Sequence, residues 1–588
     1  MTYQLSVLLA VFYLGYGFDY FGLLNVSARG YPSTVFTVLV AVAIGAARWI
    51  RRFIPAEQCR ARLLWQRVAI AGAAATTFQV WFGLPEFGLD GDEVLRFAMA
   101  RAIQIVGLPF DLGWFIAGAK EMQQSYLFSE WTAALIGSGL RDVIPLEHLY
   151  YSLLPVAVRS ALVVCAWELA DRMRGQSGSL TAYDGRTALG DALIAGLCLF
   201  GPTPYFGGAW NTLTRQSVLG FLLMLLAYRI VFDLLEDCRH DTSGGNPRLW
   251  RVQAVLLGAL MCTLVATKLL FATVCWGALM GVSALLLIRS RRKVVALHLI
   301  LTVVAGVVSL GMFPTRAPEG SWVVMLPQLA SSSFVPALTN VYLSTAISLG
   351  AVAIPVFLLA SWLSGRDYVR HATPWLAGAL LVFLTGLLPG LFLKYSGNTG
   401  NAESYWLVAA WFGLLILGLA AIAGARTRRA ITVVTAYLIV SFAHSSALEV
   451  EAASAYRKYY DSRRSASAVC REVNGWIVEH DPDRDRTFAI AHEWQGKTVF
   501  EIAGYCAAPS VVSTSPYADL QTLPEWRDAN AANSQMTSAA DISAIVREYK
   551  ARTGLDGVFV IRRRNNPLPM PQHRMLASTD DYIVYGPL

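Results

Sequence analysis

The sequence predicts a mainly α, polytopic transmembrane helical bundle followed by a small C-terminal α/β domain. Hydrophobic residues make up 55% of the 588 residues and charged residues only 15%, whereas a typical soluble domain has about 25% charged residues. The apolar residues also form runs of about 20, the length that a helix needs to cross roughly 30 Å of hydrocarbon. The formal net charge of +8 therefore reports membrane orientation first, and we expect no nucleic-acid partner.

Apolar runs predict about thirteen spans when a window of roughly 19 residues is moved along the chain. The nearly continuous apolar stretch 252–289 is divided at 270/271, because about 38 residues are too many for one crossing. The first run lacks the charged start and the cleavage site of a secretion signal, so we interpret it as a span. The predicted spans are 3–25, 32–50, 66–84, 150–170, 187–206, 213–235, 252–270, 271–289, 294–313, 341–363, 374–393, 405–424 and 430–447.

Basic residues follow every even-numbered span and are sparse after the odd-numbered ones. The tightest cluster, Arg289 to Lys293, follows the eighth span, and merging the two spans that meet at 270/271 would invert every later loop. By the positive-inside rule the even-numbered exits are cytoplasmic. We therefore expect an integral cytoplasmic (inner) membrane protein with a cytoplasmic N-terminus.

This orientation places three long segments outside: 85–149, 314–340 and 448–588. Residues 1–447 form the predicted transmembrane domain. The last segment has short β-rich runs at 487–493, 509–515, 557–563 and 581–587, and a helical stretch at 541–554 that ends at Gly554, which predicts a small extracytoplasmic α/β domain. Cys470 and Cys506 could form a disulfide there, although two unpaired cysteines are an equal alternative.

The acidic stretch LDGDE (89–93) lies where the third apolar run ends. It is followed by EVLRFAMARAIQIVGLP, in which apolar residues recur with a period near 3.6 until Gly107 and Pro109. We expect a helix over 94–106 that lies on the outer membrane surface. In a plainer interpretation, the acids only cap this helix and interact with its dipole.

This loop resembles the first extracytoplasmic loop of the GT-C superfamily of glycosyltransferases. The similar features are the D-x-D-E stretch, the short helix with an R-F-A-x-A-R-A pattern and the G-x-P stop. The number of spans and the outer C-terminal domain fit the same plan. In many members the acidic loop follows the first span, whereas here it follows the third, so the branch is open.

The resemblance implies a bacterial cell-envelope glycosyltransferase. Its donor would be a polyprenyl-phosphate sugar, and its acceptor a glycan, a lipid or a protein at the extracytoplasmic face. Transfer to a hydroxyl needs a carboxylate that takes the proton, and the resemblance assigns this role to Asp92. Asp90 or Glu93 would hold the acceptor, and Asp90 with Asp92 could bind Mg²⁺ or Mn²⁺ through hard oxygen ligands. The sequence does not decide whether a divalent cation is required.

A lipid-phosphate donor needs cations near the outer surface. The candidates are Arg215, Lys268, Arg316 and Lys394. Lys268 lies deep in apolar sequence, where an ionisable residue is a functional-site hypothesis by default; the alternative is that it extends to the interface.

Three further residues are candidates for the acceptor or substrate cavity: His148, Arg96 and Glu403. His148 could instead be a packed histidine at a helix start, and the polar segment 394–406 around Glu403 could be an ordinary turn. Trp476, Trp494 and Trp526 could stack on sugars, although core packing is the commoner use of tryptophan.

Two other functional classes fit the composition. A transporter or lipid flippase should show inverted repeats and paired broken helices, and the sequence shows no such symmetry. A non-catalytic envelope assembly protein would need no intact acidic triad.

Arg229 and Asp233, four residues apart on one span, are expected to pair with each other.

Overall fold

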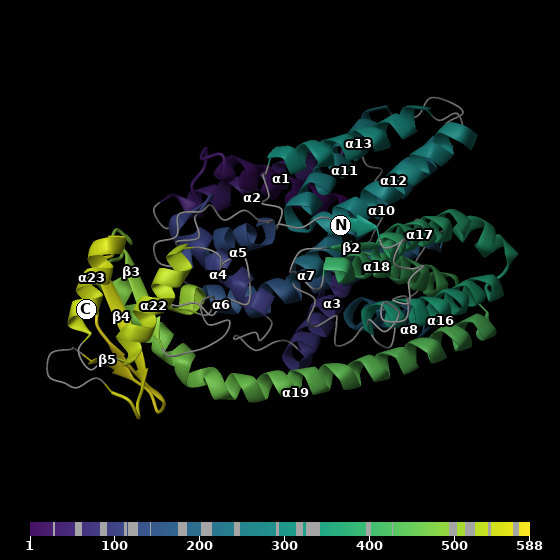
Figure 1. Cartoon of the computed structure of the whole chain (residues 1–588). Helices are drawn as coiled ribbons and strands as arrows, with labels where there is room; N and C mark the ends of the chain where they lie inside the picture. The colour runs from purple at the N-terminus through teal and green to yellow at the C-terminus, as the bar shows by residue number, and fades with distance from the viewer. Residues whose placement is uncertain are drawn as a thin grey trace. The chain divides into compact units, whose positions relative to one another are not determined.

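The described residues form a mostly helical structure with a four-stranded C-terminal sheet and a separate two-stranded ribbon (Figure 1). The computed structural model describes residues 1–27, 30–52, 61–82, 91–110, 114–115, 127–140, 143–174, 185–201, 215–239, 247–289, 293–312, 322–324, 341–395, 402–425, 427–492, 502–511, 524–538, 542–567 and 575–588. These residues divide into two compact units. The bundle unit comprises Met1–Leu14, Leu39–Gly83 and Ser152–Ala453, and the polar unit comprises Gly15–Val38, Leu84–Tyr151 and Ser454–Leu588.

Every predicted span coincides with a helix. Nine helical segments among the described residues are long and apolar enough to cross a membrane, and 188–200 and 350–363 are shorter apolar helices. The helices α1 and α3 match predicted spans but lie outside this group of nine. The helices concerned are α1 (Thr2–Tyr20), α2 (Pro32–Ile50), α3 (Ala61–Phe82), α7 (Leu154–Met173), α8 (Gly185–Phe200), α10 (Arg215–Arg239), α11 (Pro247–Thr267), α12 (Leu269–Arg289), α13 (Lys293–Met312), α16 (Val341–Leu363), α17 (Arg366–Phe392), α18 (Ala402–Gly424) and α19 (Arg428–His480).

The predicted division of the long apolar stretch is confirmed. The helix α11 ends at Thr267 and α12 begins at Leu269. Met261 on α11 and Val282 on α12 line the same pocket, whereas a straight helix would hold them about 30 Å apart. The chain therefore folds back at Lys268.

The helices α10 and α18 form the centre of the bundle unit. Their apolar windows are 94% and 100% buried, against 11% for α2, as expected for helices that are hydrophobic on all sides. Glycine allows α18 to approach α17 closely. A side chain at Gly413 would meet the carbonyl oxygen of Ala379, and one at Gly386 would meet the backbone of Ala410, so small residues bring these two helices together.

The C-terminal part of the polar unit is a small α/β domain. Its sheet has the order β3-β4-β6-β5, with β3 (Phe488–His492) parallel to β4 (Gly557–Arg563) and the other pairs antiparallel. The remaining elements are β5 (Met575–Ser578), β6 (Tyr582–Tyr585), α22 (Pro524–Ser538) and α23 (Ser543–Thr553). The predicted strands at 487–493, 557–563 and 581–587 and the helix ending at Gly554 are confirmed, whereas within 509–511 only an isolated bridge from Ser510 forms.

Alternating side chains of the sheet pack against two layers of helix. Val558 and Val560 join a core with α22 and α23. Phe488 and Phe559 contact Trp476 near the end of α19 with ring centroids 5.7 and 5.4 Å apart. The packing interpretation is thus confirmed for Trp476, while the side chains of Trp494 and Trp526 lie outside the described residues.

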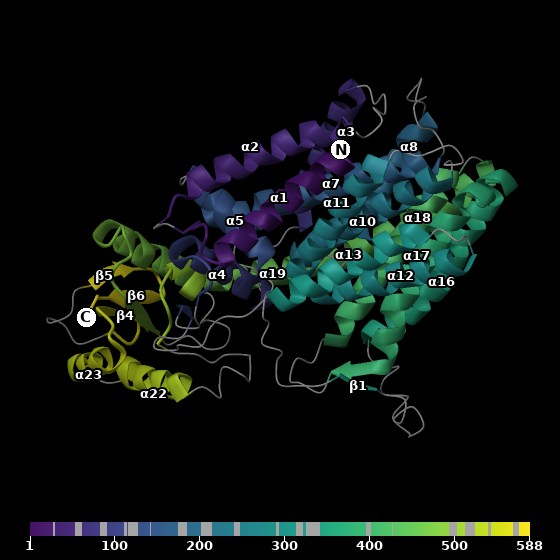
Figure 2. The ribbon, with the colours of Figure 1, turned by 90° about the horizontal axis from the view of Figure 1, so that it is seen from above.

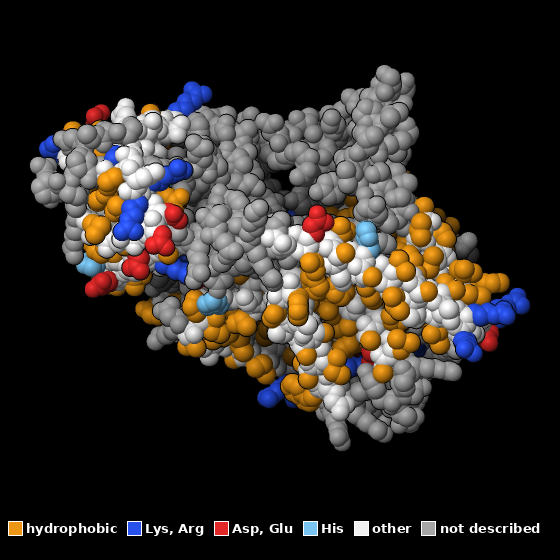
Figure 3. All heavy atoms as spheres, turned by 90° about the horizontal axis from the view of Figure 1, so that it is seen from below, with side chains coloured by type: hydrophobic (Ala, Val, Ile, Leu, Met, Phe, Trp, Pro, Cys, Tyr) orange, Lys and Arg blue, Asp and Glu red, His pale blue; other side chains and the backbone are white. Residues whose placement is uncertain are grey.

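The predicted domain boundary at 447/448 falls inside a helix. The helix α19 continues from Arg428 to His480, and the compact units divide at Ala453/Ser454. A helix continues beyond an apolar segment when the polar residues that follow also have high helix propensity. The fall in hydropathy near residue 447 therefore does not coincide with the end of α19. On the face that Figure 3 shows, hydrophobic side chains are spread over the helices, while Lys, Arg, Asp and Glu side chains are more frequent on the C-terminal domain.

Candidate functional site

The acidic stretch opens a well-packed helix in the polar unit. The predicted helix is confirmed as α4 (Gly91–Val106), and it ends at Gly107, whose φ of +86° suits glycine. Asp92 and Glu93 occupy its first turn, while their side chains and the whole of Asp90 lie outside the described residues. The assignments of base, acceptor ligand and divalent cation therefore stay predictions.

The helix α4 is buried on most of its surface. Phe97, Ala98, Ala100 and Ile103 are fully buried, and α4 packs against α5 (Phe128–Gly139) and the π-helical turn η3 (Ile502–Cys506). The Phe97 ring lies 5.0 Å from that of Tyr505. This packing joins the loop 84–151 to the C-terminal domain within one unit and holds α4 rigidly in place.

Arg101 on α4 links three segments of the polar unit. Its Nη2 donates to Glu147 at 2.8 Å, Nη1 donates to Gln104 at 2.7 Å, and Nε donates to the carbonyl of Gly504 at 3.3 Å. Glu147 belongs to α6 (Leu146–His148), which leads through the turn η2 (Leu149–Leu153) into α7. These hydrogen bonds of Arg101 add to the apolar contacts of Phe97 in holding α4.

Arg96, one of the predicted cavity residues, lies near a fully buried carboxylate. Its Nε is 3.9 Å from Glu130 on α5, which also accepts a hydrogen bond from Ser129 at 2.8 Å. Glu130 has no exposed surface. Arg96 is thus engaged one turn beyond Asp92, close to the start of α4.

His148 is exposed at the end of α6, although it also makes a contact with another group, so the alternative of a packed histidine stays open. Its predicted role at the acceptor site stays a prediction.

Asp19 is a buried acid that the sequence-based search missed. Its carboxylate accepts hydrogen bonds from Trp131 Nε1 at 2.9 Å and from the backbone of Val26 at 3.2 Å, and the residue is 1% exposed. It fixes the turn after α1 against α5 within the polar unit. A single acid inside the first predicted span was the signal, because such residues are expensive in hydrocarbon.

Three of the four predicted phosphate-binding cations lie in described elements of the bundle unit, towards one end of it. Arg215 begins α10, Lys268 separates α11 from α12, and Lys394 is in β2 (Leu393–Tyr395), which pairs with β1 (Trp322–Val324). Figure 2 shows this ribbon beyond the ends of the neighbouring helices. Lys268 is half-buried, the side chains of Arg215, Lys394 and Glu403 are outside the described residues, and so is the whole of Arg316.

Helix register supports this common end. Gly277 on α12 faces Thr385 on α17, and Gly281 faces Leu381, so the two helices run antiparallel. Continuing this register by about two turns brings Lys268 to the level of Lys394. Glu403, in the first turn of α18, lies at the same end because α17 and α18 are packed neighbours joined by a short connection.

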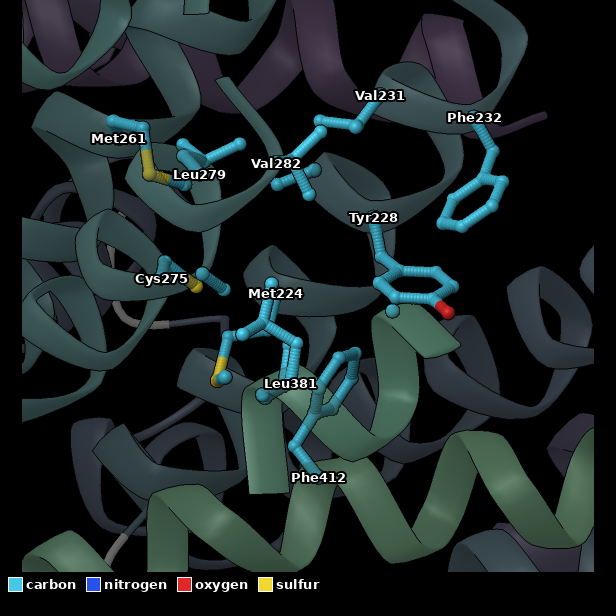
Figure 4. Close-up of a pocket in the computed structure, with 14 residues that line it drawn as sticks. Met224, Tyr228, Val231, Phe232, Met261, Cys275, Leu279, Val282, Leu381 and Phe412 are labelled. Atoms are coloured by element: carbon cyan, nitrogen blue, oxygen red, sulfur yellow. The ribbon is translucent and has the colours of Figure 1, made fainter. Parts of the chain in front are cut away.

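An apolar pocket lies within the bundle unit (Figure 4). It has a volume of about 50 Å³ and is lined by α10, α11, α12, α17 and α18. Met224, Met261 and Phe412 contribute flexible and flat apolar surfaces. Thioether side chains adapt to irregular apolar ligands, and this pocket suits part of a hydrocarbon chain.

Contacts in the structure decide two questions that the sequence raised. Arg229 Nε lies 2.9 Å from Asp233, which confirms the predicted pair on α10. Cys470 and Cys506 form a disulfide that connects the last part of α19 to η3. Among the described residues no three His, Cys, Asp or Glu side chains are grouped so as to hold a metal.

We expect the disulfide to stabilise the polar unit substantially. The two cysteines are 36 residues apart, and closing a loop of that length removes unfolded-state entropy equivalent to about 4 kcal/mol. The double variant Cys470→Ala, Cys506→Ala should therefore show a lower Tm in a thermal melt of the detergent-solubilised protein. Reductant should lower the Tm of the native protein and leave that of the variant unchanged; equal melting of both proteins without reductant would contradict the prediction.

Neither protein-family models nor curated protein sequences give a match to this chain.

Proposed function

We propose that the protein is a membrane glycosyltransferase that moves a sugar from a polyprenyl-phosphate donor to a glycan, lipid or protein acceptor at the extracytoplasmic face. The proposal rests on the position and packing of α4. This helix begins with Asp92 and Glu93 and is held by α5 and η3 in a unit separate from the bundle. A reacting carboxylate needs such a rigid support.

The chain segments that make up the polar unit support the proposed orientation. Its three segments, 15–38, 84–151 and 454–588, form one compact unit. We take the loops within these segments to lie on one side of the membrane, which requires an even number of crossings between consecutive segments. The thirteen proposed spans satisfy this condition, with α2 and α3 in the first interval and ten spans from α7 to α19 in the second. The disulfide supports an oxidising, extracytoplasmic compartment for this unit.

The donor would bind at the bundle. Its phosphate would meet the cationic end formed by Arg215, Lys268 and Lys394, with Arg316 as a further candidate, and its chain would lie against apolar surfaces such as the pocket of Figure 4. Cations that neutralise a leaving phosphate stabilise the charge that develops there.

The proposed chemistry is a single displacement. The acceptor oxygen forms a bond to the anomeric carbon while the bond from that carbon to the phosphate oxygen breaks. Asp92 takes the acceptor's proton, and the phosphate leaves with the electron pair. No acid is needed for a phosphate leaving group, so one carboxylate suffices.

The direct test uses the full chain in proteoliposomes with a radiolabelled polyprenyl-phosphate sugar and a mixture of envelope glycans and lipids. We expect label to become attached covalently to an acceptor, with release of polyprenyl phosphate. Label that remains on the donor under all acceptor conditions would contradict the proposal.

A lipid transporter or flippase is the second candidate, and the apolar pocket within the bundle unit favours it. In the same proteoliposomes this function predicts that the labelled lipid crosses the bilayer without covalent transfer. A non-catalytic assembly protein predicts neither outcome.

A further inference from the structure

Two arginines in the polar unit are fixed on one turn of backbone, away from the acidic start of α4. Arg101 Nε donates to the carbonyl of Gly504 at 3.3 Å, and Arg484 Nη1 donates to the carbonyl of Ala507 at 3.3 Å. These carbonyls are three residues apart, in and just after η3. The turn is tied to α19 by the disulfide at Cys506.

The two guanidinium groups repel each other. Burial and the nearby charge of Arg101 lower the pKa of Arg484 to about 10, and the opposite effect of Asp481 does not compensate. The carboxylate of Asp481 also accepts the backbone N–H groups of Asp485 and Arg486. Keeping a partly buried cation beside a second cation costs folding free energy.

The backbone around this pair is strained as well. Arg484 and Ala507 have φ values of +55° and +54° and are the only described non-glycine residues with positive φ. Such conformations are costly and cluster where a fold positions groups for a ligand. Arg484 Nη2 also donates to Asn474 at 2.7 Å, so the guanidinium plane is held in place.

We infer that Arg101 and Arg484 form an oxyanion-binding site at η3 that takes a phosphate or carboxylate group. Guanidinium groups bind these planar or tetrahedral anions with charge-assisted, directional hydrogen bonds. Gln104 and Asn474, each bonded to one of the arginines, add amide groups beside the site. An anion that contacts both guanidinium groups would offset their repulsion, which Glu147, bonded to Arg101, offsets only on the side of Arg101. This inference does not depend on the proposed sugar transfer.

The ligand could be a free anion, an acidic sugar or a lipid headgroup, and three probes separate these sources. Inorganic phosphate, glucuronate and farnesyl phosphate would each be titrated into the full-length protein in detergent, at constant ionic strength, while the Tm is measured. We expect a saturable rise in Tm with at least one probe. A response to farnesyl phosphate alone would identify a lipid headgroup, and a response to glucuronate alone would identify an acidic sugar.

The variant Arg484→Gln should weaken the apparent affinity by at least about tenfold, because it removes hydrogen bonds from a charged group. Its own Tm is measured as the reference, because the variant removes both the repulsion and the hydrogen bonds of Arg484 to Asn474 and Ala507. Arg486→Gln changes an exposed arginine two residues away and should leave binding intact. Arg101→Lys, which keeps the charge beside Glu147, is a second variant and should also weaken binding.

The inference is overturned if no probe raises the Tm. It is also overturned if Arg484→Gln and Arg101→Lys bind as tightly as the native protein, or if Arg486→Gln weakens binding as much as they do.

Discussion

Replacing Asp92 by asparagine is expected to lower sugar transfer by about 10²- to 10⁴-fold, the usual contribution of a general base. Asparagine keeps the size and the hydrogen-bonding oxygen of the side chain but cannot take up a proton. The measurement is the initial rate of transfer from labelled donor in proteoliposomes with equal amounts of folded protein.

The same variant separates catalysis from helix capping. If Asp92 only interacts with the dipole of α4, its loss should cost about 0.3–1 kcal/mol of stability and leave the rate per folded molecule unchanged. Asp483→Asn is the matched control, because it removes an exposed acid from the polar unit without touching α4. If the transfer rate of Asp92→Asn is within about twofold of that of this control, Asp92 is not the general base.

Hydropathy and charge were sufficient to predict the helices of the bundle. Both act locally, since a crossing needs about 20 apolar residues wherever it occurs. The division predicted at 270/271 followed from the same argument, and the structure confirms two helices there, with the break at Lys268. Hydropathy marks a change of environment rather than the end of a helix, which is why α19 passed through the predicted domain boundary.

The support of the candidate site could not be predicted, because it depends on contacts between distant segments. Phe97 meets Tyr505, and Arg101 meets both Glu147 and Gly504. Periodicity showed that α4 would have an apolar face, but it could not show what covers that face. We expected a helix on the membrane surface, and in the structure protein elements of the polar unit cover most of it.

Another group of charges missed in the sequence lies inside the bundle unit. Arg67 on α3 binds Asp191 on α8 at 3.2 Å and also Asp171 on α7. Arg174 lies 2.9 Å from Asp171. Arg67 and Asp191 have side chains that are only 4% exposed. Arg67 and Asp191 lie near the starts of the predicted spans 66–84 and 187–206, and nothing in the sequence shows that they meet. In the structure they connect three helices at their ends.

Replacing Asp191 by alanine is expected to lower the free energy of unfolding by about 3–5 kcal/mol, because it leaves the buried Arg67 with one carboxylate fewer. The double variant Arg67→Met, Asp191→Leu should recover most of this loss, since Asp171 keeps Arg174 and an apolar pair replaces the buried charges. Unfolding by denaturant in detergent would give the free energy of unfolding of each variant. Asp367→Ala, at an exposed position in the first turn of α17, should cost no more than about 1 kcal/mol. If Asp191→Ala costs no more than this control, the buried ion pair does not hold α3 to α8, and apolar packing of these helices is sufficient.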